Sequence, residues 1–190
     1  MSDQFHTPRE RLYLPFLAGF YSGFAGPVGW LLFRLIIGGA LVVEGWAKIQ
    51  NPMAQIALAE SLGFYPGWFF SPLIAFSNFF GGMLIMVGFL TRPMAFLNAF
   101  MLAVTWWFHY TRPYGDVFLT PAGIEYLTAN ADLLTAAGKQ RLLPDGGARF
   151  LAAVQGKAEF NSMFWAAGAA LIACLGGGRL SLDRRLPKEV

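Results

Sequence analysis

The sequence predicts an all-α membrane protein, built as a four-transmembrane-helix bundle with interfacial helices and a partly helical long loop between helices three and four. Three observations support this fold class. Four stretches of about 16 to 20 residues carry few charges, which is the length a helix needs to cross a bilayer core. Apolar residues make up 56% of the 190 residues and charged residues only 13%. The segments between the stretches are rich in turn-forming and interfacial residues.

The chain has room for one membrane domain and no second full-sized domain. We expect residues 1–27 to form a polar tail followed by an aromatic interfacial segment, because Pro and Gly interrupt a run rich in Phe and Tyr. Residues 28–186 form the predicted membrane domain, and residues 187–190 form a C-terminal tail. The predicted helices cover about residues 28–47, 73–90, 94–110 and 160–175, and an extramembrane loop covers residues 111–157.

The first two connections differ in kind. Pro52 can begin a short helix, and the Gly and Pro residues within 63–67 end it. This pattern predicts a surface lid, followed by an aromatic anchor at residues 68–70. Residues 91–93 alone join the second and third predicted helices. So short a turn predicts an antiparallel hairpin.

The third connection is long enough to have structure of its own. Thr120 followed by Pro121 is a favourable N-cap and first helical residue, and apolar residues then recur at helical spacing. A second helical stretch at residues 148–155 can continue into the fourth predicted helix.

Composition excludes several redox centres and several partners. The single cysteine, Cys174, rules out an internal disulfide, an iron–sulfur cluster and a CxxC pair. A bis-histidine haem would need both His6 and His109, and His6 lies in the polar tail. The net charge of +3 comes from dispersed Lys and Arg, which fit headgroup contacts and topology signals better than nucleic acid. We expect no intrinsic cofactor and no metal, so a bound quinone or a protein partner would carry electrons.

Helix one carries three charged residues at membrane depth, Arg34, Glu44 and Lys48. In one interpretation, Arg34 and Lys48 reach opposite surfaces and Glu44 pairs with Lys48 at i, i+4. In the other, Glu44 is a buried carboxylate that faces a small ligand or a proton path, and Arg34 is a ligand-binding residue.

Amides within the predicted spans have a structural interpretation, because they can hydrogen-bond between helices in lipid. The predicted structural polar residues are Lys48, Asn78, Asn98 and Asn161. Small residues at i, i+4, such as Ala95, Ala99 and Ala103, favour close helix packing and are compatible with a homodimer.

The end of the third predicted helix concentrates aromatic residues around His109. Such residues commonly form an interfacial belt. Alternatively, Trp106 and Tyr110 supply flat walls for a quinone headgroup and His109 supplies a hydrogen-bonding group, while Glu159 orients His109 or shares a proton with it. The candidate catalytic residues are Glu44, His109 and Glu159, and the candidate ligand-binding residues are Arg34, Trp106, His109 and Tyr110.

Three motifs resemble the DoxX family of small bacterial membrane proteins: RLIIGGALVVEGWAKI in helix one, FFGGMLIMVGFLTRPMAFLNAFMLAV across the hairpin, and GGGRLSLDRRL after helix four. The resemblance implies a four-helix integral membrane protein related to the DoxD subunit of thiosulfate:quinone oxidoreductase. The family-motif positions it implies are Arg34, Glu44, Gly45, Lys48, Gly82, Gly88, Thr91, Arg92, Glu159, Gly178, Arg179, Ser181 and Asp183. The last motif also has a simpler interpretation, in which glycines end helix four and Arg184 and Arg185 meet anionic headgroups.

We therefore expect an integral membrane subunit of an oxidoreductase system, with a quinone as the candidate ligand. The alternative is a non-catalytic assembly or scaffold subunit, which docks a larger membrane complex through its long loop and C-terminal tail. In both cases the expected partners are the lipid bilayer and proteins of a membrane complex. The expected location is the bacterial inner membrane, as a multi-pass protein with both termini in the cytoplasm.

Overall fold

The computed structural model describes residues 12–112 and 120–186, and all regular secondary structure in these ranges is helical. The all-α class is thus confirmed for this part of the chain. The α-helices of these ranges are α1 (Ala18–Phe20), α2 (Gly26–Gln50), α3 (Ile56–Ser61), α4 (Gly67–Phe76), α5 (Gly82–Val87), α6 (Thr91–Thr111), α8 (Pro121–Ala129), α9 (Ala136–Leu142) and α10 (Ala148–Leu175). The chain forms two compact units: unit 1 contains residues up to Phe100 and from Ala167 onward, and unit 2 contains Met101–Ala166.

Within the described ranges, three helical runs are long and apolar enough to cross a membrane: Pro15–Gln50, Gly67–Val87 and Ala148–Leu175. They contain the predicted spans at 28–47 and 160–175 and the predicted span at 73–90 as far as Val87, because Gly88 takes a left-handed conformation that ends the helix. The remaining one forms α6, a helix of 21 residues whose second half holds Thr105, two tryptophans, His109 and Tyr110. These side chains are less apolar than aliphatic ones and favour the interface, so the crossing by α6 stays a prediction.

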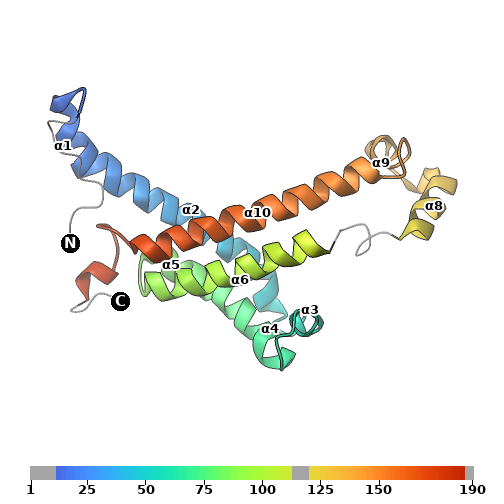
Figure 1. The fold of residues 1–190 in the computed structure, drawn as a ribbon, viewed down its shortest axis with the longest axis horizontal. Coiled ribbons are helices and arrows are strands. Elements are labelled where there is room, and N and C mark those ends of the chain that lie inside the picture. The colour runs from blue at the N-terminus through green and yellow to red at the C-terminus, as the bar shows by residue number, and fades with distance from the viewer. Residues whose placement is uncertain (1–11, 113–119, 187–190) are drawn as a thin grey trace. The chain divides into compact units, whose positions relative to one another are not determined.

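The first helical run begins well before the predicted start at residue 28. Helical backbone extends without interruption from Pro15 to Gln50, seen as the blue run in Figure 1. Pro27 has no N–H, and its ring crowds the carbonyl four residues earlier. A π-helical turn at Tyr21–Ala25 widens the backbone just before Pro27, which lets the helix continue instead of breaking. The aromatic segment is therefore helical, and its interfacial position stays a prediction.

The second helical run also starts earlier than predicted, at Gly67 instead of residue 73. The carboxylate Oε1 of Glu60, at the end of α3, accepts a hydrogen bond of 3.1 Å from the Gly67 N–H. This bond satisfies a main-chain donor at the start of α4 and places negative charge at the positive end of the helix. Ser71 adds two bonds to the preceding connection, accepting from the Gln55 N–H at 3.0 Å and donating to the Pro52 carbonyl. The connection is thus fixed on α4.

Helix α2 packs against α5 and the π-helical turn Ser77–Gly81 through glycines. A Cβ atom added at Gly38 would lie 2.7 Å from the Gly82 carbonyl oxygen. One added at Gly45 would lie 2.5 Å from the Phe79 main-chain nitrogen. Main chain therefore contacts main chain, the packing that small residues permit in lipid. Gly38 and Gly45 are thus needed for this close approach.

The predicted antiparallel hairpin is present in unit 1. Gly88 ends α5 with a φ of +75°, and α6 begins at Thr91, so residues 91–93 form the first helical turn instead of the loop. Asn98, which is fully buried, donates through Nδ2 to the Ser77 carbonyl at 3.0 Å. Asn98 therefore makes the interhelical hydrogen bond that the sequence predicted.

Unit 2 contains most of the predicted long loop. Thr120 caps α8 by accepting a hydrogen bond of 3.1 Å from the Gly123 N–H, as predicted. Helix α10 begins at Ala148, where the second helical stretch was predicted to begin, and continues through the fourth predicted span as one unbroken helix of 28 residues (Figure 1). Asp145 stabilises this start, because its carboxylate accepts from the main-chain N–H groups of Gly147 and Arg149 at 3.2 and 3.3 Å.

Candidate functional site

Unit 1 contains a cluster of buried polar side chains that binds the segment following α10. We call Trp30, Arg34 and Asp183 the tail cluster. Arg34 is only 1% exposed and donates to two main-chain carbonyls, through Nη1 to Gly177 and through Nη2 to Leu180 at 2.8 Å. Trp30 Nε1 donates to the Gly176 carbonyl at 3.0 Å. Helix α2 thereby binds the main chain of the C-terminal segment.

Asp183 connects the same segment to the hairpin. Its carboxylate oxygens accept from the main-chain N–H groups of Leu90 and Thr91 at 2.7 and 3.0 Å. Its own N–H donates to the Gly88 carbonyl at 2.8 Å. The side chain therefore acts as an N-cap for α6, supplied from the far end of the sequence, and its charge is favourable at the positive end of the helix. The Asp183 charge also acts on Arg34.

Several family-motif positions are explained by this packing. A Cβ atom at Gly88 would lie 2.6 Å from Arg34 Nη1 and equally close to the Ser181 Cβ, so only glycine fits the left-handed turn there. Gly178, with a φ of +75°, packs directly against the Trp30 ring. Ser181 donates to the Gly178 carbonyl at 2.8 Å. The three sequence motifs therefore meet in one place, which their local patterns did not show.

Arg92 and Arg179 lie at the same end of unit 1. A Cβ atom at Gly176 would be 2.9 Å from Arg92 Nε, which places the Arg92 side chain over the end of α10. Positive charge there is favourable for the helix dipole. Arg179 Nη1 donates to the Ser22 carbonyl at 3.0 Å.

The tail cluster is built to stabilise the fold. Two of the three Arg34 nitrogens and both Asp183 oxygens bond to main-chain groups, while Arg34 Nε makes no hydrogen bond within the described residues. Arg34 was predicted to bind a ligand, but its Nη1 and Nη2 atoms donate hydrogen bonds to the C-terminal segment.

Unit 2 contains a second polar group, formed by His109, Gln155 and Glu159. Gln155 Nε2 donates both to the His109 main-chain carbonyl and to Glu159 Oε1, the latter at 2.6 Å. Glu159 lies close enough for its charge to act on the His109 ring. All three residues are half-buried. The structure thus brings together two residues that the sequence singled out, through a third that it did not. The available signal was the i, i+4 spacing of Gln155 and Glu159 on one helix.

Aromatic residues precede and follow His109 along the end of α6. Trp106 and Tyr110 stack with ring centroids 5.8 Å apart and an interplanar angle of 29°. Tyr110 is 62% exposed, so the stack presents a flat surface. The Arg112 guanidinium lies 5.1 Å from the centroid of the Phe108 ring, a cation–π contact.

The remaining predicted residues lie outside these two groups. Glu44 is exposed. It lies on α2 next to the row of buried residues that contains Gly45, and not within that row. Lys48 is half-buried one turn away, and the Glu44 charge acts on it. Asn78 is buried at the contact with α2, whereas Asn161 is exposed. No group of three His, Cys, Asp or Glu residues in the described part of the chain is arranged to hold a metal.

Comparison with known proteins supports the resemblance over part of the chain. Residues 29–111 match the DoxX family model. The inner membrane protein YqjF of Escherichia coli is 36% identical over 83 residues, which are 43% of this chain and 62% of the relative. The matched region thus spans less than two thirds of that relative. No solved structure matches the chain.

The matched residues extend from α2 to the end of α6 and exclude the C-terminal GGGRLSLDRRL motif. They include Arg34, Gly45, Gly82 and Gly88, the positions that pack α2 and turn the hairpin. This membrane protein is therefore similar to the DoxX family over residues 29–111.

Proposed function

We propose that this chain is an integral membrane subunit of an oxidoreductase system and that it binds a quinone at the group of His109, Gln155 and Glu159. One observation carries the proposal: Gln155 links the His109 main chain to the Glu159 carboxylate, and the stacked rings of Trp106 and Tyr110 lie on the same stretch of α6 as His109. A quinone headgroup needs flat apolar walls and hydrogen-bond donors for its carbonyl oxygens. The residues of unit 2 fit both needs.

The chemistry that these residues supply is proton transfer. A bound quinone would accept two electrons from a partner redox protein, and its reduction to a quinol also consumes two protons. Glu159 and the His109 ring are the groups at this site that bind and release protons. Gln155 holds the Glu159 carboxylate in position through a hydrogen bond to a charged acceptor.

A binding measurement tests this proposal. The full-length protein in phosphatidylcholine nanodiscs is titrated with a short-chain benzoquinone, and quenching of tryptophan fluorescence gives the Kd. Gln155→Leu and Glu159→Gln should each raise the Kd about tenfold, since a hydrogen bond to a charged group contributes roughly 1.5–3 kcal/mol. Glu125→Gln on the exposed surface of α8 is the matched control and should leave the Kd unchanged. Equal Kd values in all four proteins would contradict the quinone site.

The tail cluster favours an alternative, a non-catalytic scaffold subunit, because the charged residues it buries serve the fold. In that case the long loop and the C-terminal tail dock a larger membrane complex, and removal of residues 121–146 is the discriminating change. Loss of co-purifying proteins with the DoxX domain intact supports the scaffold. Loss of quinone binding with the co-purifying proteins retained supports the quinone-linked subunit.

A further inference from the structure

Positive charge is concentrated around the C-terminal segment of unit 1. Residues 12–34, 82–100 and 167–186 supply the tail cluster and its surroundings, and they contain five arginines but only one acidic residue, Asp183. The Asp183 carboxylate is 9% exposed and is directed at main-chain N–H groups. Arg179, Arg184 and Arg185 are all exposed. The surface of this segment is therefore cationic.

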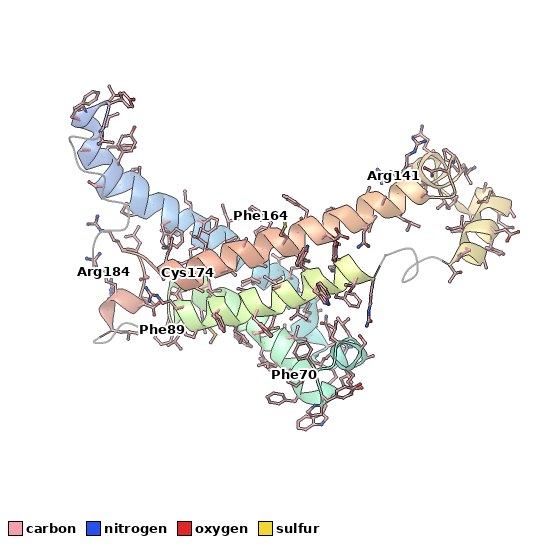
Figure 2. The ribbon with its side chains drawn as sticks, viewed as in Figure 1. Phe70, Phe89, Arg141, Phe164, Cys174 and Arg184 are labelled. Carbon is pink, nitrogen blue, oxygen red and sulfur yellow. The ribbon has the colours of Figure 1, made fainter. Side chains whose placement is uncertain are left out.

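These arginines extend from a backbone that the fold holds in place. Asp183 makes three hydrogen bonds to the hairpin and begins the short helical turn Asp183–Arg185. Arg184 lies on this segment beyond the end of α10 (Figure 2). Arg179 is positioned by its bond to the Ser22 carbonyl. A positively charged surface that is already ordered loses little conformational entropy when it binds a partner.

Two leucines lie between Arg179 and Arg184. Leu180 and Leu182 are 49% and 44% exposed, and the segment follows directly after α10, one of the helices able to cross a membrane. The segment is thus positioned where a membrane-spanning helix leaves the hydrocarbon core. Leucine side chains there can enter the acyl boundary, while guanidinium groups bind phosphate in bidentate geometry.

We propose that Arg179, Arg184 and Arg185 form a binding surface for the headgroups of anionic phospholipids. A soluble anion would use the charge alone, whereas a phospholipid also uses the exposed leucines and the position at the end of α10. Each arginine near a charged membrane surface contributes enough to change lipid association about fivefold.

The test measures lipid selectivity with the full-length chain in phosphatidylcholine vesicles that contain a trace of spin-labelled phosphatidylglycerol or spin-labelled phosphatidylcholine. Electron paramagnetic resonance gives the relative association constant of the two lipids. Wild-type protein should prefer phosphatidylglycerol, and Arg179→Gln combined with Arg184→Gln and Arg185→Gln should lower this preference at least fivefold. The matched control removes three exposed charges in unit 2, as Lys139→Gln with Arg141→Gln and Lys157→Gln, and should keep it.

Two further arms make the result specific. The double variant Arg184→Lys with Arg185→Lys retains the charge and should retain most of the preference for phosphatidylglycerol. If the triple variant misfolds, the double variant Arg184→Gln with Arg185→Gln repeats the test. Equal association of both lipids with wild-type protein would overturn the proposal, as expected if the surface binds an acidic protein instead. Displacement of phosphatidylglycerol by inorganic phosphate at constant ionic strength would also overturn it, because the surface would then bind a free anion.

Discussion

The tail cluster and the group of His109, Gln155 and Glu159 both place polar side chains in an apolar helical protein, but their surroundings differ. Arg34 is 1% exposed, and it and Asp183 bond to main-chain groups. His109, Gln155 and Glu159 are half-buried, and Gln155 joins Glu159 side chain to side chain. A buried charge bound by main chain can be released only by disrupting the fold. A half-buried side-chain link can rearrange, which leaves it available for ligand chemistry.

The largest effect should come from Arg34. Arg34→Leu removes the donors for the Gly177 and Leu180 carbonyls and a buried positive charge on which the Asp183 charge acts, and should lower the free energy of unfolding by about 3–5 kcal/mol. The thermal unfolding midpoint and the monodisperse fraction in mild detergent measure this loss. Arg141→Leu, at an exposed position on α9, is the control and should change stability by less than about 0.5 kcal/mol. If the two variants are equally stable, the tail cluster does not hold unit 1 together.

The glycine contacts of unit 1 should give the next largest effect. Gly45→Ala places a methyl group 2.5 Å from the Phe79 main-chain nitrogen and should cost about 2–3 kcal/mol, because main chain must move. Gly39→Ala on the same helix meets no atom within 4 Å and should be neutral or slightly stabilising. Comparing the thermal unfolding midpoints of these two variants isolates the steric cost of the methyl group at position 45. A Gly45→Ala protein as stable as Gly39→Ala would show that the close approach is not required.

Replacing Asp183 should give a smaller loss. Asp183→Ala leaves the N–H groups of Leu90 and Thr91 without their acceptor, and should lower the free energy of unfolding by about 2 kcal/mol. Amide hydrogen exchange should rise first at the start of α6. Asp132→Ala, an exposed acidic residue of unit 2, controls for the change in charge. Unchanged exchange at residues 90–91 would mean that α6 does not depend on this distant cap.

The smallest effect on stability should occur at Gln155. This residue distinguishes most clearly between the tail cluster and the group of His109, Gln155 and Glu159. Gln155→Leu should change the free energy of unfolding by no more than about 1 kcal/mol, because the site is half-buried and the new side chain remains helix-forming. The same variant is the one expected to weaken quinone binding about tenfold. Thermal unfolding and quinone titration on one preparation separate the two readouts. A large loss of stability with unchanged quinone binding would make Gln155 a residue of the fold and not of a site.

Much of the candidate site could be anticipated from local patterns. His109, Trp106 and Tyr110 stood out because polar and aromatic residues gather at one helix end, and Glu159 because it is an acidic residue near the start of a predicted span. Gln155 was missed, since its i, i+4 spacing to Glu159 is a weak signal until the position of the His109 carbonyl is known. The early start of α4 was missed as well, because Glu60 caps this helix from the preceding turn.

The sequence by itself determined the helical class, the apolar runs, the hairpin and the Thr120 cap, because each depends on residues close together in the chain. Only the tertiary structure decided what the charged residues do. Arg34 and Asp183 find partners 143 and 93 residues away, at Gly177 and Leu90, and these partners are main-chain groups, which every residue possesses. Periodicity reports which side chains are buried; it does not report which carbonyl or N–H a buried charge will meet.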